Sequence, residues 1–267
     1  MKIYDCFSFN DENHLLEIRL NELNEYVDYF IIVEFGENHQ GNPKGKNIDL
    51  NLIEKFKNKL RYYFVDKFNI SNDPHGRDQF QRNYAQKGLY DAKDEDIIII
   101  SDIDEIPNLK NLNFDSIKEN IIAFSQNHSM YKFNLILEEK WIGTKLCKYK
   151  KLKSPQWLRS LRVKKKYNIL RIDKLLSPRY VLNFNIIENG GWHFGWLRNA
   201  DSIISKLESY CHSEHNNEFY KDKKFIEKCI YEKKNFFDTN IKLKSVNLID
   251  LPRYIQNNKD KYTEWLS

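Results

Sequence analysis

Two aspartates, Asp102 and Asp104, follow the isoleucine run 97–100 and are separated only by Ile103. Carboxylates this close repel each other, and they tolerate burial only when a cation or hydrogen-bond donors compensate them. The divalent ions Mn²⁺ and Mg²⁺ prefer such oxygen ligands, and they also bridge the oxygens of a diphosphate and stabilise the charge on a leaving nucleotide. The pair therefore indicates a site for a divalent cation and a nucleotide diphosphate.

The residues around the segment 102–104 help to distinguish a ligand site from a solvated turn. A solvated turn is the commoner origin of two aspartates at this spacing. The apolar run before Asp102 predicts a buried strand, and Ile106-Pro107 predicts that the strand has ended. In open α/β sheets, ligands bind beyond the carboxyl ends of the strands. The position at a strand end favours the ligand site.

A second segment, 190–196, surrounds His193 with three glycines and two tryptophans. Glycine permits tight backbone turns, and a neutral imidazole is a common ligand of transition metals. A lone histidine is more often structural. The residues alone therefore leave a metal-binding and a structural role for His193 as equal alternatives.

Arg77, Gln81 and Arg82 stand at spacings of four and one in a predicted helix, so they can share one side of it. The planar fork of arginine suits phosphate oxygens. Ion pairs with Asp78 or with the acidic residues 91–96 explain the same residues equally well, and both interpretations stay open.

The apolar pattern predicts an α/β protein with a mostly parallel central sheet and a helical C-terminal region. The run 97–100 is expected at the sheet centre, and the first strand-helix-strand unit is expected to be parallel and right-handed, with Asn10 or Asp11 as the helix cap. A loop-rich region is expected between 137 and 180. Strands are predicted at 3–7, 29–33, 62–65, 97–100, 121–124, 131–137 and 180–184, and helices at 15–27, 52–60, 78–90, 203–210, 223–231 and 251–265.

The composition is that of an ordinary globular protein, with 267 residues of which 41% are hydrophobic and 30% charged, and we expect one domain. The net charge of +5 weakly favours anionic partners, but the basic stretch 145–166 has no nucleic-acid motif, so no nucleic-acid partner is expected. The four separated cysteines indicate neither disulfides nor structural zinc. Without an evident signal peptide or membrane-spanning segment, the chain is expected to be soluble and cytoplasmic, and peripheral membrane contact stays open.

These segments together resemble family 17 of the glycosyltransferases nearly from end to end. The resemblance implies one GT-A-type, Rossmann-like domain over 1–267, with a nucleotide-binding half at 1–107 and an acceptor half with C-terminal helices at 108–267. Gly195 departs from the family pattern, where a small hydroxyl residue is expected. The most specific matches are Ile100 to Pro107 and Gly191 to Phe194, and the others are 3–7, 16–23, 33–34, 41–44, 80–83, 141–144, 158–159 and 251–262.

The resemblance also implies an inverting transfer of a sugar, N-acetylglucosamine, from a UDP-sugar donor to a carbohydrate or other hydroxyl acceptor. It implies that Asp102, Asp104 and His193 hold Mn²⁺ or Mg²⁺. The expected donor-binding residues are Glu34, Arg77, Gln81, Arg82, Asp102, Ile103 and Asp104, and the expected acceptor-side residues are Trp141, Trp192, Trp196 and His212. The candidates for the catalytic base are Asp173, Glu188 and Glu214, which all follow the aspartate pair in the chain.

Two other functions remain alternatives. A metal-dependent phosphohydrolase also carries paired aspartates after a hydrophobic strand, although Ile106 stands where a haloacid-dehalogenase-like pattern expects Thr or Val. A non-catalytic module that binds glycans or an anionic polymer would bind them without a nucleotide.

Overall fold

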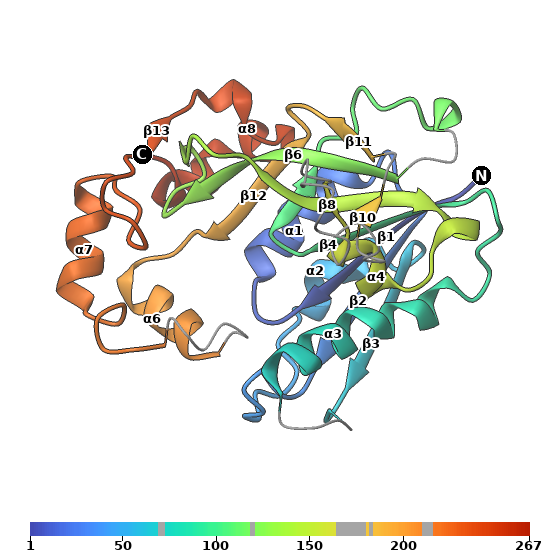
Figure 1. The fold of residues 1–267 in the computed structure, drawn as a ribbon, viewed down its shortest axis with the longest axis horizontal. Coiled ribbons are helices and arrows are strands. Elements are labelled where there is room, and N and C mark those ends of the chain that lie inside the picture. The colour runs from blue at the N-terminus through green and yellow to red at the C-terminus, as the bar shows by residue number, and fades with distance from the viewer. Residues whose placement is uncertain (69–72, 118–120, 164–179, 182–183, 210–215) are drawn as a thin grey trace, which may run out of the picture.

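The computed structural model describes residues 1–68, 73–117, 121–163, 180–181, 184–209 and 216–267. Within these residues, eleven strands form a mixed sheet whose main path has the order β13-β7-β6-β8-β4-β1-β2-β3. The sheet runs through the middle of the molecule, with helices packed around it (Figure 1). The predicted α/β class is confirmed.

Four strands make up the parallel half of the sheet. β1 (Ile3–Phe9) lies between β2 (Tyr29–Phe35) and β4 (Ile97–Asp102), and β3 (Leu60–Val65) pairs with β2. All three pairings are parallel, as expected for the first strand-helix-strand unit. The inner position predicted for 97–100 is confirmed, because β4 pairs with β1 on one side and with β8 on the other.

The other half of the sheet corrects the prediction of a mostly parallel arrangement. β8 (Trp141–Lys148) pairs antiparallel with β4 and with β6 (Ile121–Met130). β11 (Phe184–Ile187) and β12 (Gly191–Trp196) run parallel to β6, whereas β5 (Glu105–Pro107) runs antiparallel to β12. An apolar pattern shows that a strand is buried but not its direction, so the sequence could not reveal this mixture. The remaining strands are β7 (Leu135–Ile136) and β13 (Lys244–Ser245) at the sheet edge, and β9 (Arg162–Val163) paired with β10 (Tyr180–Val181).

Helices cover both faces of the parallel half. Along β4, Ile97 and Ile99 belong to one apolar cluster and Ile98 and Ile100 to another, because successive side chains of a strand point to opposite faces. The first cluster includes α1 (Asn13–Leu23), α2 (Leu50–Glu54) and α8 (Arg253–Asn257). The second includes α3 (Pro74–Tyr84), α4 (Pro155–Ser160) and the 3₁₀ helix η1 (Ala85–Leu89). Other 3₁₀ turns are η2 (Phe114–Ser116), η3 (Tyr149–Lys151), η5 (Leu248–Asp250) and η6 (Lys259–Trp265).

A third apolar cluster joins α6 (Ala200–Ser209) and α7 (Lys223–Tyr231) to the end of the sheet. Ile203 and Ile226 from these helices are fully buried in it beside Trp196, the last residue of β12. Both helices lie at one side of the molecule, beyond the end of β12 (Figure 1). This cluster holds α6 against the rest of the structure and so places the side chains that α6 directs inward.

Several helix boundaries differ from the prediction. α1 begins at Asn13, because the carboxylate of Glu12 accepts hydrogen bonds from the amides of Asn10 and Asp11 and keeps them in a turn. α3 begins at Pro74, where the side chain of Asp73 caps it. The predicted helix 52–60 is α2, which ends at Glu54, and the predicted helix 251–265 is divided into α8 and η6.

The strand predictions fail mainly in the second half of the chain. β6 continues to Met130, and Tyr131, with φ of 65°, turns the chain, so the strand predicted at 131–137 is reduced to β7. The segment 190–196, expected to form tight turns, is mostly the strand β12. Ile106-Pro107 follows the end of β4, as predicted, but belongs to a second short strand, β5, which pairs with β12. Gly191 permits this pairing, because its φ is 127° and a Cβ there would collide with the carbonyl oxygen of Ile106.

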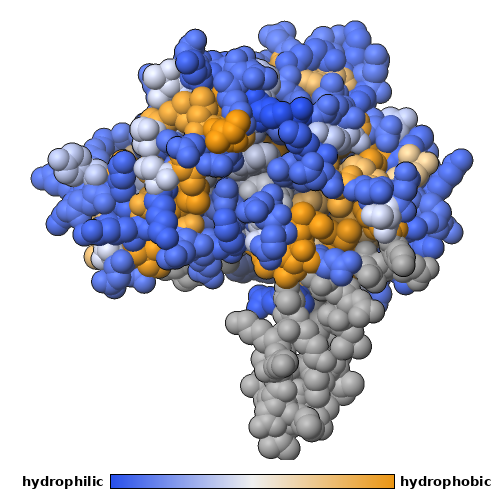
Figure 2. Space-filling view, turned by 90° about the horizontal axis from the view of Figure 1, so that it is seen from above, coloured by the Kyte–Doolittle hydropathy of each residue, from blue (hydrophilic) through white to orange (hydrophobic). Residues whose placement is uncertain are grey.

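Across the described residues, no helix combines the length and the apolar character that a membrane crossing would need. Figure 2 shows one face of the molecule, on which hydrophobic residues form separate patches among hydrophilic ones.

Candidate functional site

A cavity of about 730 Å³ lies beyond the carboxyl ends of β1 and β4. Phe9 and Asn10 line it from the end of β1, and residues 102–105 line it from the end of β4. Residues of α3, α4, α6, β8 and β12 complete the wall. This is the edge of the sheet at which open α/β proteins bind their ligands.

Asp102 is the last residue of β4, and arginines hold both of its carboxylate oxygens. Arg82 Nη2 lies 2.8 Å from Oδ1, and Arg159 Nη2 lies 2.9 Å from Oδ2. Desolvation favours the neutral acid, but the two guanidinium groups outweigh it and hold the pKa of Asp102 well below its usual range. Asp102 is therefore ionised, and each of its oxygens accepts a charged hydrogen bond.

Asp104 points into the same cavity but has looser partners than Asp102. His193 Nε2 lies 3.8 Å from its Oδ1, and Lys206 Nζ from α6 lies 3.5 Å from its Oδ2. Lys206 also donates a hydrogen bond of 2.5 Å to the carbonyl oxygen of Gly195. These longer contacts leave the oxygens of Asp104 available to a ligand in the cavity.

His193 is brought to Asp104 by the pairing of β12 with β5, in which it stands opposite Glu105. Burial, followed by the charges of Lys206 and Arg159, lowers the pKa of His193 to about 3, so its imidazole is neutral. Within the described residues its Nδ1 is buried without a hydrogen-bond partner. A Cβ at Gly195 would lie only 2.8 Å from Nε2. Glycine at 195 therefore keeps the space beside this nitrogen open, which gives a physical reason for the unusual residue there.

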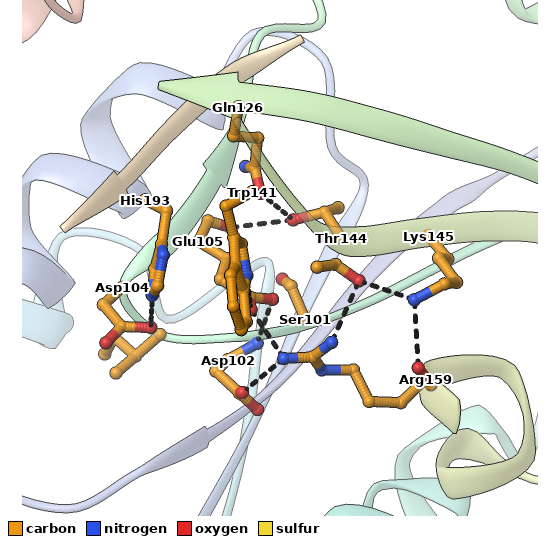
Figure 3. A network of polar contacts seen from close by, with 12 residues as sticks. Ser101, Asp102, Asp104, Glu105, Gln126, Trp141, Thr144, Lys145, Arg159 and His193 are labelled. Atoms are coloured by element: carbon orange, nitrogen blue, oxygen red, sulfur yellow. Dashed lines mark hydrogen bonds and ion pairs between the residues drawn. The ribbon is translucent and has the colours of Figure 1, made fainter. Parts of the chain in front are cut away.

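Glu105 is a buried carboxylate behind the two aspartates (Figure 3). Its Oε1 accepts hydrogen bonds from Arg159 Nη2 at 2.6 Å and from Trp141 Nε1 at 2.5 Å, and its Oε2 accepts one from the amide of Asp102 at 3.1 Å. Burial raises the pKa of Glu105, and Arg159 opposes that rise. Trp141 in turn stacks on His193 with ring centroids 4.6 Å apart. Glu105 thus links Arg159 and Asp102 to the aromatic side of the cavity.

Asp104 and His193 suit a divalent cation as two of its ligands. One carboxylate and one neutral imidazole face each other, and their 3.8 Å separation is compatible with a shared ion, because donor atoms bound at about 2.1 Å lie at most ~4.2 Å apart. Asp102 suits it less as placed, because both of its oxygens bind arginine. In the described part of the chain, no cluster of three or more His, Cys, Asp or Glu residues could hold a metal. A cation here would need ligands in addition to these two side chains.

The structure brings some of the other predicted residues to this cavity and leaves others elsewhere. Ile103, Gln81, Arg82, Trp141 and Trp196 line the cavity. Gln81 is fixed by hydrogen bonds from its amide nitrogen to the carbonyl oxygens of Phe9 and Val33, which lie in the adjacent strands β1 and β2.

Four predicted residues are placed away from the cavity wall. Glu34 is buried beside it in contact with Lys44 and Tyr62, and Arg77 donates to the carbonyl oxygen of His39. Trp192 points to a smaller pocket beside α8, where its Nε1 donates to the carbonyl oxygen of Asp250. Glu188 is exposed in the turn before β12. The remaining candidates, Asp173, His212 and Glu214, lie outside the described residues.

Three cavity residues were not singled out from the sequence. Glu105 directly follows Asp104, so its position was a signal, but nothing in the pattern distinguished it from a solvated acid. Arg159 lies in the basic stretch 145–166, in which no binding motif was found. Lys206 is one lysine of a C-terminal helix, and only the packing of α6 brings it to Asp104.

Comparisons with known proteins bear on the family of this chain. The model of Glycosyltransferase family 17 matches residues 1–162, which include Asp102, Asp104 and Arg159. Curated relatives named beta-1,4-mannosyl-glycoprotein 4-beta-N-acetylglucosaminyltransferase, from Rattus norvegicus and Homo sapiens, are each 24% identical to this chain over 232 residues. The aligned region covers 78% of this chain but only 42% and 43% of these relatives, so the chain spans less than half their length. Because the family model covers more than half of the sequence, the chain belongs to glycosyltransferase family 17.

Proposed function

We propose that this chain transfers N-acetylglucosamine from UDP to a hydroxyl group of a carbohydrate acceptor, with inversion at the anomeric carbon and on a GT-A-type fold. The observation that carries the proposal is the pair Asp102 and Asp104 at the end of β4, inside a cavity that also holds Arg82, Arg159 and Lys206. In this arrangement Asp104 offers a carboxylate to a cation, and the arginine and lysine side chains offer positive charges to a diphosphate. The identity of the transferred sugar is inferred from the name of the curated relatives.

The donor would occupy the part of the cavity between the end of β1 and residues 102–104. Asp102 is presented there in one orientation, because Arg82 and Arg159 hold its two oxygens. Arg82 is itself held by Asp78 through two hydrogen bonds of 2.9 and 3.0 Å. A network of this kind costs little reorganisation when substrate binds, which is the condition for electrostatic stabilisation of a transition state.

Asp104 and His193 would hold the Mn²⁺ or Mg²⁺, which would stabilise the negative charge on the departing diphosphate. Lys206 places an ammonium group 3.5 Å from Asp104, at the same side of the cavity. It can therefore bind a diphosphate oxygen directly while Asp104 turns to the cation. The neutral state of His193 leaves a lone pair for this role.

The acceptor would bind beside the aromatic residues Trp141 and Trp196, whose rings suit contact with the apolar faces of a sugar. One-step inversion requires a carboxylate that accepts the proton of the attacking hydroxyl on the face opposite the diphosphate. Asp173 and Glu214 stay our candidates for this base. Glu188 is the weakest of the three, because it is exposed and does not line the cavity.

A thermal-unfolding screen of nucleotides and nucleotide sugars, each with and without Mn²⁺, tests the donor site first. A ligand that binds the folded state raises the melting temperature, by an amount that grows with the ratio of its concentration to its Kd. We expect UDP and UDP-N-acetylglucosamine with Mn²⁺ to give the largest shifts, and GDP or CMP smaller ones. No shift with any nucleotide would contradict the proposal and would favour a nucleotide-independent binding module.

The transfer itself is tested by incubating the protein with UDP-N-acetylglucosamine, Mn²⁺ and mannose-containing oligosaccharides and identifying the products by mass spectrometry and NMR. The expected product carries one additional N-acetylglucosamine in the β-configuration, because inversion of an α-linked donor gives a β-linkage. Release of phosphate from simple phosphoesters, without any sugar transfer, would instead favour the phosphohydrolase.

A further inference from the structure

Arg19 in α1 is a fully buried cation that reaches the loop between β4 and β5 and does not line the cavity. Its Nη1 lies 3.1 Å from the carbonyl oxygen of Asp102, 3.4 Å from that of Ile103 and 2.8 Å from that of Glu105. Its Nη2 also donates a hydrogen bond of 2.5 Å to the hydroxyl of Ser101. One guanidinium group therefore contacts nearly every residue of the segment that carries the two aspartates.

In this segment, the carbonyl group of Asp104 is bound by a backbone amide instead of by Arg19. The amide of Phe194 in β12 donates to the carbonyl oxygen of Asp104 at 2.7 Å. The backbone acceptors of residues 102–105 are thus all occupied, three by Arg19 and one by the strand that carries His193. Because these carbonyl groups point to buried donors, the side chains of Asp102 and Asp104 are left to face the cavity.

The charge of Arg19 is neutralised by Asp5 in β1, which is also fully buried. Arg19 Nε and Nη2 donate to its two oxygens at 2.8 and 2.6 Å. The guanidinium also lies 4.5 Å from the ring centroid of Phe7. A buried ion pair of this kind is commonly no more stabilising than apolar residues of the same volume, so stability alone does not explain it.

We propose that Arg19 is a positioning residue for the donor and cation site: it fixes the backbone of residues 102–105 and thereby sets where the carboxylates of Asp102 and Asp104 stand. This inference rests on the proposed function for the role of the two aspartates, but the order of the loop can be measured without it. The planar fork is essential, because the ammonium of lysine cannot bind Asp5 with two hydrogen bonds and reach three carbonyl groups together.

The test compares Arg19→Lys with Arg61→Lys in the full chain. Arg61 is a matched control, because it also forms a two-point pair, with Asp91 at 2.7 and 2.9 Å, but its hydrogen bonds within the described residues go to Gly88 and Asp91 and not to residues 101–105. Ser101→Ala removes the hydroxyl that Arg19 contacts and serves as a milder variant should Arg19→Lys fold poorly. Each protein is examined by thermal unfolding, by amide hydrogen exchange over residues 102–106, by binding of UDP with Mn²⁺, and by kcat and KM.

For Arg19→Lys we expect faster hydrogen exchange in 102–106 and a fall in kcat of roughly 100-fold, the scale for a displacement of about 1 Å at reacting groups. Ser101→Ala should show both effects more weakly, and Arg61→Lys should lose stability while keeping its kcat and the exchange rates of 102–106. If exchange in 102–106 is unchanged in both Arg19→Lys and Ser101→Ala, the inference is wrong, whatever the activity. If exchange accelerates but the unaltered protein binds no nucleotide, the role of Arg19 in the loop stands and the proposed function fails.

Discussion

The two ends of the parallel strands both carry arginine and aspartate side chains, but they are arranged differently. At the amino-terminal end, Asp91 accepts hydrogen bonds from Arg61, Lys2 and Tyr4, so both of its oxygens are bound by protein donors. At the carboxyl end, Asp102 is held in the same way by two arginines, but its neighbour Asp104 has its nearest cationic partner 3.5 Å away. The Arg61 pair does not line the cavity, whereas Asp102 and Asp104 do.

This difference shows that paired charges alone do not make a binding site. The cluster at Asp91 satisfies itself, and a ligand would gain little by displacing any of its members. The cluster at Asp104 brings one loosely held carboxylate together with a neutral imidazole and a lysine at the wall of a cavity. Substitutions at the two ends of the strands test this difference.

The largest effect is expected for Asp104→Ala at the carboxyl end. It should lower sugar transfer by on the order of 100-fold or more, the scale for losing one preorganised group that stabilises transition-state charge. Transfer is measured as kcat over a series of Mn²⁺ concentrations. The matched change Asp91→Ala should leave kcat close to normal. Near-normal transfer by Asp104→Ala at saturating Mn²⁺ would contradict the assignment of Asp104 as a ligand of the cation.

The next largest effect is expected for Arg159→Lys, which should lower the free energy of unfolding. Lysine keeps the positive charge, but with a shorter side chain and a single nitrogen it cannot reproduce the contacts of Nη2 with Asp102 and Glu105 together with that of Nη1 with the carbonyl oxygen of Gly143. Losing one charged hydrogen bond costs roughly 1.5–3 kcal/mol. Urea unfolding at neutral pH gives this free energy directly. The result would be contradicted by an unchanged unfolding midpoint, which would show that Arg159 is not needed to hold the two carboxylates.

Lys206→Met tests the part of the cavity that differs most from the Asp91 cluster. Because Lys206 is proposed to bind the diphosphate, its loss should weaken UDP binding by about tenfold, equivalent to one charged hydrogen bond of ~1.5 kcal/mol. Mn²⁺ alone should bind at least as tightly as before, because the ammonium group no longer competes for Asp104. Calorimetric titrations with UDP and with Mn²⁺ separate these opposite effects, and weaker binding of both would contradict the assignment.

Asp91→Asn should have the smallest effect and one limited to stability. Hydrogen bonds from Arg61, ahead of those from Lys2 and Tyr4, hold the pKa of Asp91 well below its usual range. The stability that ionised Asp91 contributes to the folded state is therefore complete above the usual aspartate pKa of about 4, and it is lost as the pH falls further through the folded-state pKa. At pH 7 the free energy of unfolding of Asp91→Asn should be about 1 kcal/mol lower than that of the unaltered protein, the scale for partly exposed pairs. This difference between the two proteins should shrink in acid. A difference that grows in acid would contradict this pairing.

Some of this structure could be predicted because it depends on local pattern. The isoleucines 97–100 are apolar on both faces, so they had to form a strand covered from two sides, and β4 is that strand. The position of Asp102 and Asp104 at its carboxyl end then followed directly. Arg77, Gln81 and Arg82 were expected on one side of a helix, and α3 places Gln81 and Arg82, but not Arg77, at the cavity.

Other features depended on contacts between distant segments and carried no local signal. Asp104 and His193 meet because β12 pairs with β5, a pairing of two strands that neither the proline at 107 nor the glycines at 190 and 191 suggested. Lys206 reaches the cavity because an apolar cluster holds α6 in place. The direction of Trp192, away from the cavity, follows from the alternation of side chains along β12.

The sequence by itself determined the buried strand, the two acids at its end and the family to which the chain belongs. Tertiary structure decided which partners those acids have: Asp102 is held by Arg82 and Arg159 through short hydrogen bonds, whereas Asp104 has longer contacts with His193 and Lys206. The physical reason is that strand formation depends on the apolar character of neighbouring residues, whereas the electrostatic environment of a carboxylate depends on groups from whichever elements pack around it.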